Sequence, residues 1–190
     1  MNGKLLSLMM TTIMIASALA GCAGDDVDLD GEDGGYEYAS NVDNHRMLMG
    51  DVCDIKDLSG AYDWDEVSDI YENGKYAEKS DGSYRTLEGF ASASGKNHAY
   101  DTYYGSDGSW DTFVSAAISG TGPFAGESNT VRDQAVEKGI QNGVMTAYAI
   151  HELNAAIIKA EAGIWGADDA QHAWDEGWAF YHGPDDSDRD

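Results

Sequence analysis

The chain has 190 residues and a formal net charge of -24, with 35 Asp and Glu against 11 Lys and Arg. Such an acidic surface repels nucleic acids and anionic lipids, so neither is expected as a partner. A hydrophobic fraction of 42%, with 11 tyrosines and 5 tryptophans, is sufficient for one folded domain and argues against disorder. The excess of negative charge favours cations, although solubility in salty water explains the same composition.

The first 21 residues are predicted to be a lipoprotein signal peptide. Lys4 precedes an apolar run from Leu5 to Ala20, and the run is followed by Gly21 and Cys22. This ending is similar to a bacterial lipobox, in which the cysteine is lipidated and becomes the new N-terminus. An ordinary cleaved signal peptide is the alternative. We expect a protein held in the periplasm or at the outer cell surface by lipid on Cys22, because no other stretch is apolar for long enough to span a bilayer.

The second cysteine is expected to have no disulfide. With Cys22 assigned to the lipid, Cys53 has no partner within the chain. A single cysteine of this kind is most often a small buried hydrophobic residue. A bridge between two molecules is the alternative.

Residues 22–41 are predicted to form an acidic, flexible tether with a weak calcium motif. The pattern D-x-D-x-D-G-x5-E of an EF-hand loop occurs once in it. Its carboxylates are Asp26, Asp28, Asp30 and Glu37. Asp33 stands where such loops carry an aliphatic residue, and no helix precedes the motif. An acidic spacer produces this match by chance, so Ca²⁺ binding is the weaker interpretation.

Residues 42–184 are predicted to form an all-α domain, an irregular helical bundle with long loops, before a polar tail at 185–190. Apolar residues recur at helical spacing in several stretches. The expected helical stretches are 42–76, a turn near 85–90, 109–118, 130–161 and 168–183. Gly- and Ser-rich loops separate them.

The long helix over 130–161 is predicted to begin with a capping box formed by Thr130 and Asp133. Its apolar stripe advances in steps of three and four residues. The stripe consists of Val136, Ile140, Val144, Ala147, His151, Ala155, Ile158 and Ala162. His151 therefore lies on the face that is expected to be buried, where a core histidine bonded to a backbone carbonyl is the plainer interpretation.

The last helix is predicted to be capped by Asp168 or Asp169 and to end at Gly183 and Pro184. Two faces separate within it. One is an aromatic stripe of Trp174, Trp178 and Tyr181, which we expect to be buried. The other carries the ionisable residues His172, Asp175 and Glu176.

A short connection makes the last two helices antiparallel neighbours. His151 and Glu152 are then expected to meet the ionisable face of the last helix. Helical bundles build metal sites from histidines and carboxylates on facing helices, and this mixture suits Fe(III). The alternative is that these groups pair with each other and hold no metal.

Enzymatic activity is not expected. His151 and Glu152 begin an H-E-x-x-H pattern, but Ala155 stands where the second histidine is required. The sequence has no G-x-S-x-G motif and no glycine-rich phosphate loop. Cys53 lacks the flanking signature of a nucleophile.

Four motifs resemble the iron-assimilation family, which includes the low-iron-inducible periplasmic proteins of algae and the phytotransferrins. They are Ile70 to Lys75, Ser80 to Leu87, Ala149 to Leu153, and His172 to Gly183. The His-x-Trp-Asp-Glu element of the last motif is also similar to one in imelysin-like iron-regulated lipoproteins. In the family the helical region continues beyond this motif, so an incomplete domain is an alternative.

The resemblance implies a helical surface protein that captures ferric iron for uptake, with carbonate as a co-bound anion and a possible iron transporter as partner. Arg85 is the candidate anion-binding residue. The candidate iron ligands are His151, Glu152, His172, Asp175, Glu176 and Tyr181. The alternatives are a surface interaction protein without metal and an imelysin-like, peptidase-related protein.

Overall fold

The computed structural model describes residues 32–96 and 99–184. Within these ranges the regular structure is helical, apart from one isolated bridge between Glu78 and Tyr84. The all-α prediction is therefore confirmed. The predicted signal peptide, Cys22, the calcium-motif residues Asp26, Asp28 and Asp30, and the polar tail lie outside the described residues.

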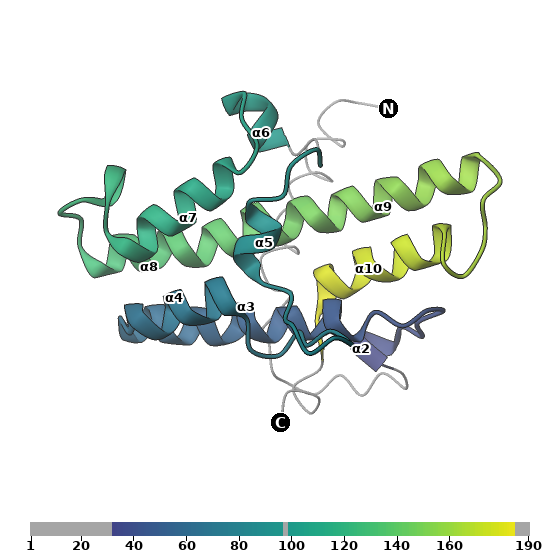
Figure 1. Ribbon diagram of the computed structural model, residues 1–190, viewed down its shortest axis with the longest axis horizontal. Helices are drawn as coiled ribbons and strands as arrows, with labels where there is room; N and C mark the ends of the chain where they lie inside the picture. Colours follow the sequence, from purple (N-terminus) through teal and green to yellow (C-terminus); the bar gives the residue numbers. More distant parts are fainter. Residues whose placement is uncertain (1–31, 97–98, 185–190) are drawn as a thin grey trace, which may run out of the picture.

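Figure 1 shows a long rod formed by α8 and α9, with α7 beside its first half and α10 returning beside its second. The elements are α2 (Glu32–Gly35), α3 (Asp43–Ala61), α4 (Trp64–Asn73), α5 (Leu87–Ala91), α6 (Ala99–Tyr104), α7 (Ser109–Ser119), η1 (Gly122–Phe124), α8 (Asn129–Lys138), η2 (Gly139–Met145), α9 (Thr146–Glu161) and α10 (Ala170–His182). Helix α10 packs against both α9 and α3, and α3 also packs against α4 and α8. The last helix thus joins the two halves of the molecule.

The core lies where α3, α4, α5 and α7 meet the long rod. Its fully buried side chains include Leu48, Ile55, Tyr71, Leu87, Val114 and Ile140. On α3 the buried apolar positions follow one another at helical spacing, as a helix with one face toward the core requires.

The start of α8 differs from the predicted capping box. Ser128 is the N-cap, and its hydroxyl accepts a hydrogen bond from Val131 N at 3.3 Å. Asp133 instead accepts a hydrogen bond from the Ser59 hydroxyl at 2.8 Å. Its carboxylate therefore connects α8 to α3, and the N-cap role passes to the serine two residues earlier than expected.

A π-helical segment, η2, changes the face that the long rod buries. Its hydrogen bonds join residues five apart, so each turn holds more residues than an α-turn. The buried stripe consequently advances in multiples of four residues, through Val136, Ile140, Val144, Tyr148 and Ala156. The predicted stripe through Ala147 and His151 assumed ordinary α-helical turns and was wrong beyond Val144.

Helix α10 buries small residues, and the predicted aromatic stripe is largely exposed. Ala173 and Gly177 are buried, whereas Trp174 and Tyr181 are 45% and 42% exposed. A Cβ on Gly177 would lie 2.8 Å from the Leu153 side chain, so α9 and α10 approach closely only because this residue is glycine. Of the three aromatic residues, Trp178 is the one anchored inward, since its Nε1 donates to the Asp33 carbonyl at 3.1 Å.

The segment 33–40 packs against the domain, which differs from the flexible tether predicted for 22–41. The Asp33 side chain is fully buried and receives two hydrogen bonds from the Arg46 guanidinium, at 2.5 and 2.6 Å. Tyr36 and Ser40 both donate to Asp175 on α10. The segment is therefore part of the folded unit.

Cys53 is buried and disulfide-bonded, so the prediction that it has no disulfide was wrong. That prediction depended on assigning Cys22 to a lipid. The sequence contains two cysteines, and Cys22, the other one, lies outside the described residues.

Replacement of Asp33 by asparagine is expected to lower the free energy of unfolding by about 3 kcal/mol, because Arg46 loses its buried, charged, two-point partner. Asp43→Asn is the matched control, since Asp43 contacts the same arginine at 3.5 Å but its side chain is 67% exposed. That change should cost less than about 1 kcal/mol. Urea titration followed by circular dichroism measures both, and equal losses would contradict the importance of the buried pair.

Candidate metal and anion site

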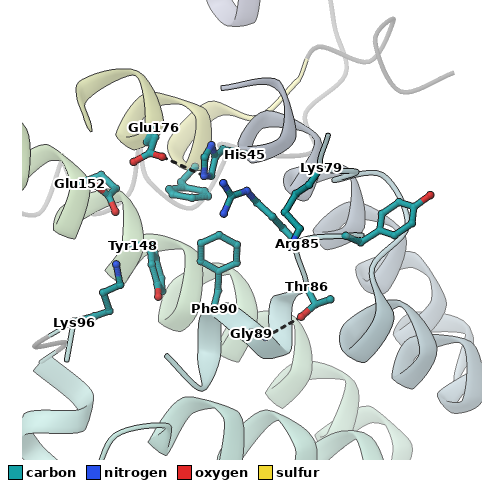
Figure 2. A pocket seen from close by; sticks show the side chains of 12 residues that line it. His45, Lys79, Arg85, Thr86, Gly89, Phe90, Lys96, Tyr148, Glu152 and Glu176 are labelled. Carbon is teal, nitrogen blue, oxygen red and sulfur yellow. Dashed lines mark hydrogen bonds and ion pairs between the residues drawn. The ribbon is translucent and has the colours of Figure 1, made fainter. Parts of the chain in front are cut away.

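A cavity of about 440 Å³ lies between α3, the loop before α5, α9 and α10. Figure 2 shows Glu152 and Glu176 on one side of it, the Arg85 guanidinium near His45, and Lys96 beside Tyr148. Phe90 and Phe180 form an apolar wall, with ring centroids 5.2 Å apart. Acidic, basic and aromatic groups thus line a single space.

Glu176 is the centre of the ionisable cluster. Its Oε1 atom lies 3.2 Å from His45 Nε2 on α3 and 3.2 Å from His172 Nε2, one turn earlier on α10. Its side chain also shares a hydrogen bond with Glu152 of α9. Burial raises the pKa of Glu176, and the neighbouring Glu152 carboxylate raises it further, while His172 and Arg85 oppose the shift.

His45 is neutral in this cavity. Burial lowers its pKa to about 3, and the positive charges of Arg85 and His172 add to this effect. Nε2 faces Glu176, whereas the buried Nδ1 has no hydrogen-bond partner among the described residues. A buried polar atom without a partner costs about 1–3 kcal/mol, and such a cost is typical of functional sites.

His172 is oriented by a chain of hydrogen bonds from the N-terminal segment. The Ser40 hydroxyl donates to Asp175 at 2.7 Å and lies 2.8 Å from His172 Nδ1. Because the serine proton is directed to Asp175, its oxygen accepts the proton carried by Nδ1. Nε2 is thereby directed to Glu176, 3.2 Å from Oε1. Metal-binding histidines are held in the same way, by a hydrogen bond to the other ring nitrogen.

Asp175 is itself fully buried and accepts three hydrogen bonds. Tyr36 donates at 2.6 Å, and the backbone N–H and hydroxyl of Ser40 both donate at 2.7 Å. Asp175 was predicted to be a ligand on the face of His172. It lies on the opposite side of that imidazole from the cavity's Glu176 and acts on the ring through Ser40.

Among the other predicted residues, Arg85 lines the cavity and its Nε donates to Asn44 Oδ1 at 2.6 Å. His151 does not line the cavity, and its Nε2 lies 3.9 Å from Glu152 Oε1. Tyr181 contacts Trp178 and does not line this cavity. Glu37, the last residue of the calcium motif, is exposed.

The described residues contain no group of three or more His, Cys, Asp or Glu side chains already arranged to hold a metal ion. The potential ligand atoms instead contact each other, since both imidazoles lie 3.2 Å from Glu176 Oε1. An entering cation would have to replace the protons of these groups, as metal binding by imidazole and carboxyl groups commonly does.

Sequence reasoning missed His45, Lys79 and Lys96. His45 has a detectable signal, because it precedes Met49 and Val52 on the buried stripe of α3. The two lysines have no local signal, since only the folded chain brings their loops to the cavity.

The loop that carries Lys79 and Arg85 is held by its own backbone. Arg85 N donates to the Ala77 carbonyl at 2.9 Å, and Lys79 N donates to the Ser83 carbonyl at 2.7 Å. Gly74 adopts a φ of +72°, and a Cβ there would lie 2.7 Å from the Arg85 carbonyl oxygen. The loop thus sits close to the end of α4 because residue 74 is glycine.

A model of the Fea1 family, described as low iron-inducible periplasmic protein, matches residues 9–190. The chain belongs to this family. The match confirms the resemblance to the iron-assimilation proteins, whereas the imelysin-like resemblance stays a prediction. No curated protein and no solved structure matches the Fea1 chain significantly. The family description gives a periplasmic location, and none of the helices described in this Fea1 protein is both long and apolar enough to cross a membrane.

Glu176→Gln is expected to raise the urea midpoint of the iron-free protein near pH 7.5. The pKa of Glu176 is higher in the folded than in the unfolded chain, so its stabilising effect exists at low pH and is lost as pH rises through the raised value. The advantage of the variant should therefore be present near pH 7.5 and absent near pH 4. Glu161→Gln, at an exposed position of α9, is the control and should change neither midpoint. A lower midpoint for Glu176→Gln near pH 7.5 would contradict this account.

Proposed function

We propose that this Fea1 family protein captures ferric iron outside the cytoplasm for uptake, with carbonate as a co-bound anion. The observation that supports this most directly is the convergence of two imidazoles and the Glu152 carboxylate on Glu176, in the wall of a cavity that also carries cations without a salt bridge. The low-iron-inducible description of the family agrees with iron as the cargo.

The proposed ligands are His45, Glu152, His172 and Glu176. Fe(III) is a hard cation that prefers carboxylate oxygens and also accepts imidazole nitrogen. Capture replaces the protons that His172 and Glu176 carry, so iron binding should release protons. His151 lies next to Glu152 and is a reserve ligand in this proposal.

Arg85 is the proposed carbonate partner. Its guanidinium lies beside His45 in Figure 2 and is positioned by Asn44. A planar guanidinium matches the geometry of a carboxylate-like anion and binds it with two hydrogen bonds. The anion would offset the positive charge that Fe(III) adds. The proposal is one of binding without catalysis.

Iron binding should depend on both bicarbonate and His172. With ferric acetohydroxamate as the iron source, calorimetry is expected to detect binding that strengthens when bicarbonate is added. His172→Gln should weaken this binding by more than about tenfold, and Ser40→Ala by about tenfold, because the ring loses the hydroxyl that orients it.

His182→Gln is the matched control for this experiment, since His182 lies on the same helix and its Nδ1 contacts the Gly183 carbonyl outside the cavity. Its iron affinity should equal that of the wild type. If none of the variants alters iron binding, or if the wild type binds no iron with bicarbonate present, the proposal fails. A protein that loses only stability in these variants would be an interaction protein without metal.

Anchoring through lipid on Cys22 belongs to the same proposal, but it competes with a disulfide. One sulfur cannot carry a thioether-linked lipid and also bridge to Cys53, the only other cysteine of the chain. Lipid on Cys22 therefore requires that the Cys53 disulfide joins two molecules, and non-reducing intact mass measurement of protein purified from membranes should give a dimer with a diacylglyceryl adduct on each Cys22. A mature chain without lipid and two mass units lighter than its dithiol form would instead indicate an ordinary signal peptide and a Cys22–Cys53 bridge.

A further inference from the structure

The cavity concentrates positive charge in a chain that has little of it. Three of the 11 Lys and Arg residues line this one space, although the chain carries 35 Asp and Glu. They are Lys79, Arg85 and Lys96. This local concentration of positive charge in an acidic protein indicates a ligand with more than one negative charge.

None of these three side chains forms a salt bridge with a carboxylate within the part of the chain that the structure describes. Three cations elsewhere do: Arg46 pairs with Asp33, Lys75 with Asp54 at 2.5 Å, and Lys138 with Glu137 at 2.6 Å. Arg132 and Lys159, outside the cavity, donate to backbone carbonyls instead. Arg85 bonds to a neutral amide, and Lys96 lies over the Tyr148 ring at 5.6 Å. In a chain with three acids for every base, unpaired cations in one cavity are held available for an external anion.

The cations lie on two sides of the cavity. In Figure 2, Lys79 and Arg85 are on one side, Lys96 is on the other, and Phe90 lies between them. Carbonate is scarcely larger than a single carboxylate group, so it contacts one side only. A ligand that engages both sides must carry carboxylates separated by a carbon skeleton.

The size and wall of the cavity agree with an organic ligand. Its volume of about 440 Å³ falls within the range of about 300–1,000 Å³ typical of small-molecule pockets. Phe90 packs against Tyr148 and Phe180, with ring centroids 4.6 and 5.2 Å apart, and offers an apolar surface to a carbon skeleton.

We infer that the cavity takes iron as a ferric complex of a small organic polycarboxylate. The outer carboxylates bind Lys79 and Arg85 on one side and Lys96 on the other, while the iron faces Glu152 and Glu176. This inference rests on the proposed capture of ferric iron and specifies the form in which the iron arrives.

The test is equilibrium dialysis with doubly labelled ferric citrate, in which iron and citrate carry different radioisotopes. Both labels should be retained by the full chain at a constant ratio. Lys79→Gln and Lys96→Gln should each weaken retention of ferric citrate by about tenfold, the effect of one charge-assisted hydrogen bond. The same variants should change iron binding from acetohydroxamate with bicarbonate by less than about twofold.

Lys138→Gln is the matched control, because this lysine is exposed and lies outside the cavity. It should leave both forms of binding unchanged. Retention of iron with bicarbonate, but not of citrate, would overturn this inference alone. Equal retention of citrate without iron would also overturn it, and failure to retain iron in any form would overturn the proposed function as well.

Discussion

One buried carboxylate fixes the geometry on which the site depends. Asp175 carries no exposed surface, and three hydrogen bonds from Tyr36 and Ser40 converge on it. These bonds secure the N-terminal segment to α10, and the same serine sets the tautomer of His172. A residue that does not line the cavity therefore decides which ring nitrogen of His172 faces Glu176.

The cavity has an acidic side and a basic side. On the side of α9 and α10, burial opposes ionisation of Glu176 and the potential ligand atoms contact each other. On the side of the loop before α5, Arg85 is held by a neutral amide instead of an acid. In the proposed function, a cation with an attached anion would compensate the charges on both sides at once, whereas either ion alone would compensate one side.

The sequence alone was sufficient for the helical class and for part of the site. Glu152, His172 and Glu176 could be brought together because α10 follows α9 after a short connection and Glu176 lies one turn beyond His172. Helical spacing also placed Asp175 with them, although its side chain turns toward residues 36–40. Such a long-range contact cannot be predicted from the helical spacing of residues in the sequence.

Two other differences have specific physical causes. The π-helical turn brings Tyr148 and Glu152, not Ala147 and His151, to the inner face of the rod. No pattern in the sequence predicted this π-helical turn. His45 reaches the cluster from α3, more than 100 positions before Glu176, so only tertiary packing joins them. Trp174 and Tyr181 remained outside because α9 approaches α10 through Gly177 instead.

The wide sequence separation of the cluster has a consequence for when it can form. Ser40 and His172 come from opposite ends of the described chain, 132 residues apart, and the ring is oriented only when both are in place. Any chain still emerging from a ribosome, or threading unfolded through an export channel, therefore lacks the assembled cluster. Docking of the final helix is the event that completes this hydrogen-bonded cluster.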